Sequence, residues 1–184
     1  MSNLPNLLSL SRIAAIPFLA LFVLWGGSSA AWAAALLFAA AAATDFFDGW
    51  LARRDGLGSD FGKLIDPVAD KLLVIAAIVL LVAVHRAPVI AALVIVLREV
   101  LISGLREFLA GRGASLPVTR LAKWKTAAQM AAIVLLLIGR AEVALPGEAL
   151  LWLAAALTCV TGADYVRRGL AEAASGLGRA KARP

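Results

Sequence analysis

Stretches of predominantly apolar residues follow one another along this chain, each close to the length that crosses a bilayer. A membrane-spanning helix needs about 20 such residues. The chain is 62% hydrophobic and 16% charged, whereas soluble domains are about 45–50% apolar and about 25% charged. The sequence therefore predicts an all-α integral membrane bundle of six transmembrane helices. The expected spans are residues 7–25, 30–50, 67–84, 88–109, 119–139 and 148–168.

Glycine and proline separate these stretches. The breaks include residues 26–29, residues 86–88 with Pro88, and Pro146-Gly147, which we expect to precede the sixth span. Ahead of the first span, residues 3–12 are expected to form a short N-terminal interfacial segment. Residues 1–174 then make one membrane domain, and residues 175–184 are expected to be a flexible basic tail.

The distribution of basic residues predicts the orientation of the chain. The net charge is +6, and the basic residues stand beside apolar runs, which favours anionic lipid and phosphorylated substrates over nucleic acid. Most Lys and Arg fall in the second and fourth connections and near the C-terminus, whereas the opposite side receives only Arg86 and Arg140. By the positive-inside rule, both termini are expected in the cytoplasm.

Acidic residues are concentrated in one segment, since six of the 12 lie between positions 45 and 70. Asp45 and Asp48 end the second expected span, and Asp66 and Asp70 begin the third. Residues three or four apart share one face of a helix. We therefore expect two neighbouring helices to direct four carboxylates toward one place.

Carboxylates gathered beside a membrane repel one another and are costly to desolvate, and a divalent cation would compensate. Oxygen ligands without nearby His or Cys favour Mg²⁺ or Mn²⁺ over Zn²⁺, and four carboxylates suit two ions. The alternative is that the acids form ion pairs with neighbouring basic side chains. Those neighbours are Arg53, Arg54, Lys63 and Lys71.

The same segment carries a specific motif. It reads Asp45-x2-Asp48-Gly49-x2-Ala52-Arg53-x8-Gly62-x3-Asp66-x3-Asp70. In its eight defined positions and in all spacings, the chain resembles the CDP-alcohol phosphatidyltransferase family.

The resemblance implies an enzyme that replaces the CMP of a CDP-linked lipid with a second alcohol, commonly as a homodimer. It implies that the four acids bind the metal ions and that Asp70 also acts as general base on the acceptor hydroxyl. It further implies a cytoplasmic active site in a bacterial inner membrane. The metal ligands would be Asp45, Asp48, Asp66 and Asp70, and the nucleotide contacts Gly49, Arg53 and Gly62.

Residues outside the motif bear on the acceptor alcohol. The chain resembles the branch of the family that transfers the phosphatidyl group of CDP-diacylglycerol to glycerol 3-phosphate. The resemblance lies in residues 3–12, 66–72 and 123–126, and in Arg98-Glu99, Arg106 and Gln129-Met130. Arg98 lies within or near the end of an apolar span, where a cation is costly and usually functional. Guanidinium and ammonium groups suit a phosphate. The expected acceptor-phosphate ligands are Arg98, Arg106, Lys123 and Lys125.

Other interpretations stay open from sequence alone. A transferase of the same family could use inositol phosphate or phosphatidylglycerol as acceptor, because the basic cluster would also serve inositol phosphate. The basic residues could instead reflect topology and headgroup contact. A small metal or ion transporter is the alternative of a different class, since intramembrane acids also mark ion pathways. The sequence assigns no role to Asp164 or Tyr165.

Overall fold

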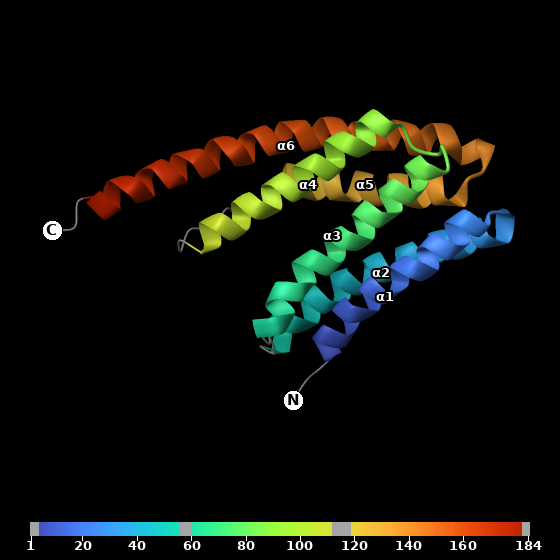
Figure 1. Cartoon of the computed structure of the whole chain (residues 1–184), viewed down its shortest axis with the longest axis horizontal. Coiled ribbons are helices and arrows are strands. Elements are labelled where there is room, and N and C mark those ends of the chain that lie inside the picture. The colour runs from blue at the N-terminus through green and yellow to red at the C-terminus, as the bar shows by residue number, and fades with distance from the viewer. Residues whose placement is uncertain (1–3, 56–59, 112–118, 182–184) are drawn as a thin grey trace.

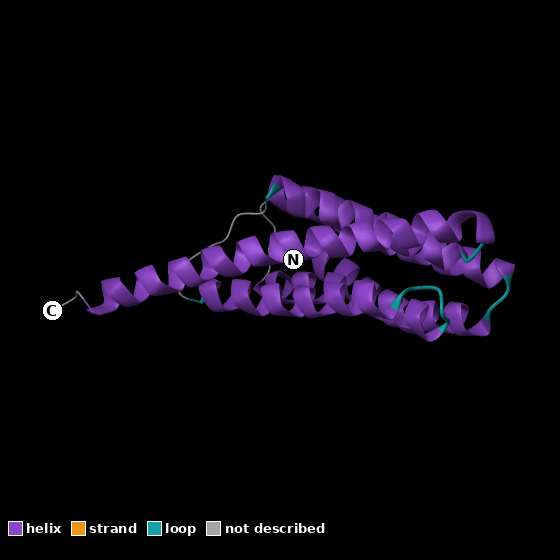
Figure 2. Cartoon of the chain, turned by 90° about the horizontal axis from the view of Figure 1, so that it is seen from above, coloured by secondary structure: helices purple, strands orange, loops and turns teal. Residues whose placement is uncertain are grey.

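A computed structural model describes the backbone of residues 4–55, 60–111 and 119–181, and the side chains of residues 10–44, 68–111 and 119–170. The described residues form helices and no strand (Figure 2). The predicted all-α class is therefore confirmed. The helices are α1 (Leu4–Trp25), α2 (Ser28–Asp55), α3 (Asp60–Ala83), α4 (Val89–Ala110), α5 (Arg120–Ile138) and α6 (Ala141–Lys181).

The helices form two packed groups that share one apolar core. Helix α1 packs against α2 and α3, α6 packs against α4 and α5, and the contact of α2 with α5 joins the groups. All six helices contribute fully buried side chains to this core. Examples are Leu19, Phe38, Leu81, Ile95, Leu137 and Leu151.

The ends of successive helices alternate between the two ends of the bundle (Figure 1). The turns from α1 to α2, from α3 to α4 and from α5 to α6 lie together at one end. The C-terminal ends of α2, α4 and α6 and the N-terminal ends of α1, α3 and α5 point toward the other end, where α6 extends beyond its neighbours (Figures 1 and 2). The segments that carry the acidic motif and the basic residues therefore lie toward the same end.

Two described helices are long and apolar enough to cross a membrane, Arg120–Ile138 and Ala141–Leu170, and only 33% and 28% of their most apolar windows are buried. Large apolar side chains such as Leu36, Leu93 and Leu153 also point outward. Extensive outward apolar surface is typical of contact with lipid. The parts of α1 and α2 whose side chains are described, Leu10–Trp25 and Ser28–Thr44, are shorter apolar stretches, so the full set of six spans stays a prediction.

Two predicted boundaries differ from the structure. Pro146 and Gly147 do not precede the last helix but lie inside α6, which begins at Ala141. Gly147 packs against α5, because a Cβ there would lie 2.9 Å from a methyl group of Leu136. The glycine thus permits close helix packing and does not mark a break.

The predicted interfacial segment is also not a separate element, since α1 runs without a break from Leu4 to Trp25. At the other end of the chain, α6 continues through residue 181 and so includes the backbone of most of the predicted tail. The flexibility of residues 175–184 stays a prediction.

The turn between α5 and α6 depends on one glycine. Gly139 ends α5 with a positive φ of 66°, a conformation that costs L-residues about 1–2 kcal/mol. The guanidinium of Arg86 lies where a Cβ of residue 139 would stand, and its Nη1 donates a 3.1 Å hydrogen bond to the carbonyl oxygen of Leu137. This contact joins the end of α5 to the turn between α3 and α4.

We expect Gly139→Ala to lower the free energy of unfolding by about 1–2 kcal/mol, because the substitution strains the backbone and displaces the Arg86 side chain. Thermal unfolding in detergent measures the effect. Gly104→Ala is the matched control, since no atom lies within 4 Å of its added Cβ and alanine favours the interior of α4. Equal unfolding midpoints for both variants would contradict the assignment.

Candidate active site

A small polar pocket lies between α3, α4 and α5. Its volume is about 40 Å³. Its lining brings Asp70, the last acid of the motif, together with Glu99 and Lys125, two residues far away in the sequence. We call it the polar pocket. It is lined by Asp70, Lys71, Val74, Glu99, Lys125, Thr126, Gln129 and Met130.

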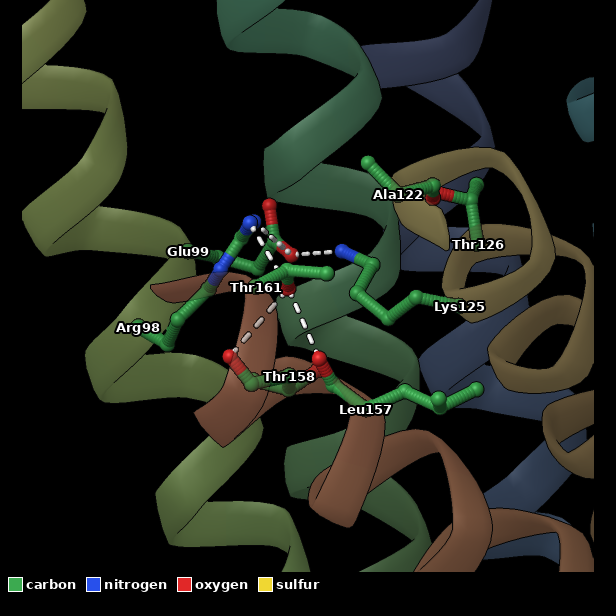
Figure 3. Close-up of polar contacts among 8 residues, drawn as sticks. All are labelled: Arg98, Glu99, Ala122, Lys125, Thr126, Leu157, Thr158 and Thr161. Atoms are coloured by element: carbon green, nitrogen blue, oxygen red, sulfur yellow. Dashed lines mark hydrogen bonds and ion pairs between the residues drawn. The ribbon is translucent and has the colours of Figure 1, made fainter. Parts of the chain in front are cut away.

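The carboxylate of Glu99 lies between two cations at the pocket (Figure 3). Its Oε1 accepts a hydrogen bond from Nζ of Lys125 and a 3.2 Å hydrogen bond from Nη1 of Arg98. The Lys125 side chain is only 5% exposed. A buried ammonium group is strongly destabilising unless it is paired, and the carboxylate of Glu99 supplies such a pair for Lys125.

Helix α6 holds the Arg98 side chain from the other side. Oγ1 of Thr161 donates to the carbonyl oxygen of Leu157 at 2.7 Å and accepts from Nη2 of Arg98 at 3.3 Å (Figure 3). The neighbouring Gly162 makes room for the stem of Arg98, because a Cβ there would lie 3.2 Å from its Cγ. Arg98 is therefore fixed by an acid on α4 and by a hydroxyl group on α6.

Tyr165, also on α6, contacts both arginines of the predicted phosphate cluster. The guanidinium carbons of Arg98 and Arg106 lie 5.6 Å and 5.8 Å from the centre of its buried ring. Cations within about 6 Å of an aromatic ring centre are attracted to its face. One side chain thus orients two guanidinium groups that are eight positions apart on α4.

The beginning of α5 is fixed by the same tyrosine. The Tyr165 hydroxyl accepts a 3.4 Å hydrogen bond from the backbone N–H of Thr119. The Thr119 side chain in turn accepts from the N–H of Ala122 at 3.2 Å, which is the usual geometry of a helix N-cap. Lys125 then lines the polar pocket, whereas Lys123 is exposed.

The structure therefore brings three of the four predicted phosphate ligands together through direct contacts. Arg98 and Lys125 share Glu99, and Arg98 and Arg106 share Tyr165. Lys123 lies near the same end of α5 and is exposed.

Most of the acidic motif lies outside the side chains that the structure describes. Its residues on α2 and α3 belong to helices, and α2 and α3 are in contact. Asp70 is the one motif side chain that is described, and it is half-buried in the polar pocket. The predicted residues outside the described side chains are Asp45, Asp48, Gly49, Arg53, Gly62 and Asp66.

Sequence reasoning assigned no site role to several residues that line or support the pocket. Thr161 and Tyr165 contact the arginines from α6, and Gln129 lies on the pocket wall. Outside the lining of this pocket, Arg12 of α1 is almost fully buried, and an arginine within an apolar helix is a sequence signal of a functional residue. For Thr161 and Tyr165 no local pattern pointed to the site.

Comparisons with known proteins identify the family. The model of the CDP-alcohol phosphatidyltransferase family matches residues 2–160. The chain belongs to this family. The matched range includes the whole acidic motif, the polar pocket and the first half of α6, up to residue 160.

Individual relatives of this CDP-alcohol phosphatidyltransferase cover nearly its whole length. A Rickettsia typhi protein is 45% identical over 91% of this chain and 97% of its own. A Bacillus subtilis protein is 40% identical over 90% and 94%, respectively. Both are named CDP-diacylglycerol–glycerol-3-phosphate 3-phosphatidyltransferase, and so is an Arabidopsis thaliana relative, numbered 2, with 41% identity over 90% of this chain and 79% of its own.

We expect Glu99→Leu to lower the free energy of unfolding by about 3 kcal/mol, because it leaves the buried ammonium of Lys125 without its carboxylate. Unfolding in detergent, followed by circular dichroism, measures the change. Glu142→Leu is the matched control, since it breaks an exposed pair with Arg140 that contributes little. A Glu99 variant as stable as this control would show that the pair is not needed for folding.

Proposed function

We propose that this chain transfers the phosphatidyl group of CDP-diacylglycerol to glycerol 3-phosphate, giving phosphatidylglycerophosphate and CMP. The observation that carries the proposal is the polar pocket, where the acid that ends the family motif meets the basic cluster. The names of the relatives, which cover at least 90% of this chain in the examples above, support the same donor and acceptor.

The reaction needs one bond to form and one to break. A hydroxyl oxygen of glycerol 3-phosphate attacks the phosphorus that bears the diacylglycerol group, and the bond from that phosphorus to the CMP oxygen breaks. The hydroxyl proton passes to the carboxylate of Asp70, and CMP leaves. A carboxylate within hydrogen-bond reach of a hydroxyl group is suited to this general-base role.

The basic cluster suits the acceptor phosphate. Two guanidinium groups and an ammonium group present many donors with fixed orientations, and Glu99 and Tyr165 hold them in place. A neutral alcohol would gain little from such a cluster, whereas a phosphomonoester would be held close to Asp70. We assign Arg98, Arg106, Lys123 and Lys125 to this role.

We further propose that Mg²⁺ or Mn²⁺, as two ions, binds the carboxylates of the motif. Asp70 fits this role, because it is a half-buried oxygen donor at a polar pocket and hard cations prefer oxygen ligands. When bound, such ions neutralise charge on the pyrophosphate of the donor. The remaining ligands would be Asp45, Asp48 and Asp66, and Gly49, Arg53 and Gly62 would contact the nucleotide.

We place the enzyme in a bacterial inner membrane as a homodimer with six spans and with both termini and the active site in the cytoplasm. The outward apolar side chains and the two long apolar helices support the membrane. The gathering of basic segments at one end of the bundle supports the orientation, and the resemblance to the family supports the dimer. Family membership favours a transferase over the ion transporter.

We expect wild-type protein in detergent to release CMP from CDP-diacylglycerol only when glycerol 3-phosphate and Mg²⁺ or Mn²⁺ are both present. Asp70→Asn should lower kcat at least 100-fold, because the general base is lost. Asp164→Asn is the control, since it breaks only an exposed pair with Arg168. Release only with inositol phosphate, or with phosphatidylglycerol, would keep the family and overturn the acceptor.

We expect Tyr165→Leu to raise the KM for glycerol 3-phosphate about tenfold, because the two guanidinium groups lose the ring that orients them. The KM for CDP-diacylglycerol should change little. Tyr165→Phe keeps the ring and loses only the 3.4 Å hydrogen bond from Thr119, so its KM for glycerol 3-phosphate should rise much less than that of Tyr165→Leu. A Tyr165→Leu enzyme with unchanged KM values would show that the ring does not organise the phosphate site.

A further inference from the structure

One buried polar atom in the polar pocket has no hydrogen-bond partner. Gln129 lies on α5 and is only 3% exposed. Its Oε1 accepts no hydrogen bond from the part of the chain that the structure describes. A buried hydrogen-bond acceptor without a hydrogen-bond donor costs about 1–3 kcal/mol. A ligand that donates a hydrogen bond to Oε1 of Gln129 would remove this cost.

The place of Gln129 in the pocket is specific. Lys125 and Gln129 are four residues apart and share one face of α5, and both line the pocket together with Asp70 of α3. Other described side chains also hold buried atoms without a partner, namely Arg12, Arg98, Ser103 and Thr158. None of these four residues lines the polar pocket.

The neighbouring hydroxyl group is already satisfied. Oγ1 of Thr126 donates a 3.1 Å hydrogen bond to the carbonyl oxygen of Ala122 within α5 (Figure 3). The pocket itself, at about 40 Å³, has room for about two to four water-sized groups. The hydroxyl-bearing end of a small alcohol fits this space, with the phosphate end left to the basic cluster.

The two hydroxyl groups of the acceptor must donate to different partners. A single hydroxyl has one proton, so the hydroxyl that gives its proton to Asp70 cannot also donate to Gln129. Glycerol 3-phosphate carries a second hydroxyl on the adjacent carbon. With one hydroxyl at Asp70, this second group is the donor available to the carboxamide oxygen on the facing helix.

We propose that Oε1 of Gln129 accepts a hydrogen bond from the non-reacting hydroxyl of the acceptor and thereby selects a phosphorylated 1,2-diol. The proposal rests on the function proposed above and adds a specificity-determining residue to it. A site that hydrogen-bonds a substrate hydroxyl rejects an analogue without that group, because the buried partner stays unpaired. Gln129 would thus discriminate against phosphorylated alcohols that lack the second hydroxyl.

The test compares glycerol 3-phosphate with 3-hydroxypropyl phosphate, which keeps the reacting hydroxyl and the phosphate but lacks the second hydroxyl. CMP release gives kcat/KM for both acceptors. If release with the analogue is slow, its inhibition constant against glycerol 3-phosphate is compared with the KM of the substrate. We expect kcat/KM of wild type to be about tenfold or more higher with glycerol 3-phosphate than with the analogue. The analogue leaves the buried Oε1 of Gln129 without a hydrogen bond, which costs free energy of this order.

In Gln129→Leu the ratio of the two kcat/KM values should fall close to one. Glycerol 3-phosphate loses the hydrogen bond from its second hydroxyl to Gln129, whereas 3-hydroxypropyl phosphate has no such hydroxyl. Activity or binding with the analogue serves as the internal control for folding. Thr126→Val is the matched variant on the same pocket wall. It should keep the wild-type preference, because the Thr126 hydroxyl donates within its own helix.

Three results would overturn the assignment: no preference in wild type, a preference that persists in Gln129→Leu, or an equal loss with both acceptors in that variant. The last result would indicate a structural role for Gln129. A wild-type enzyme that releases no CMP with either acceptor would instead overturn the proposed function.

Discussion

The ion network around Glu99 is the interaction on which the arrangement of the site depends. Its carboxylate joins Arg98 of its own helix to Lys125 of α5, and Thr161 of α6 holds the same guanidinium from the far side. Cations within an apolar bundle are costly unless they are paired. The network therefore links α4, α5 and α6 to one another. It also determines where the ammonium group of Lys125 lies at the polar pocket.

The network also creates the asymmetry of the pocket. Lys125, paired with Glu99, and Gln129 line it from one face of α5, and Asp70 lines it from α3. The proposed acceptor places its phosphate at the basic groups and its hydroxyl groups between Asp70 and Gln129. Such positioning supplies much of the rate enhancement in group transfer, because it places one hydroxyl next to the proposed base.

Helix α6 contributes more to the site than its apolar sequence indicates. Its glycines allow close packing, with Gly147 facing Leu136 of α5, and Gly162 and Gly169 facing α4. The side chains between and beside these contacts then reach the arginines. Thr161 and Tyr165 act on Arg98 only because the helix approaches α4 so closely. Packing and site geometry are therefore set by the same helix face.

The sequence by itself determined the helical class, the approximate position of each helix, the acidic motif and the family. Apolar runs and residue spacings are local properties, and they follow directly from the periods of a helix and the thickness of a bilayer. It also selected Arg98, Arg106 and Lys125, because basic groups near apolar spans are unusual. It misplaced the start of α6, since Pro146 and Gly147 have the composition of a break.

Only the tertiary structure decided which of these residues meet. Glu99 and Lys125 are 26 positions apart, and Arg98 and Thr161 are 63 positions apart. Their contacts depend on the crossing of three helices, which no local pattern encodes. The same reason explains Tyr165 and Gln129, to which residue spacing alone gives no role in the site. Their roles come from long-range packing. It places Tyr165 against two arginines, and it places Gln129 in the same pocket as Asp70.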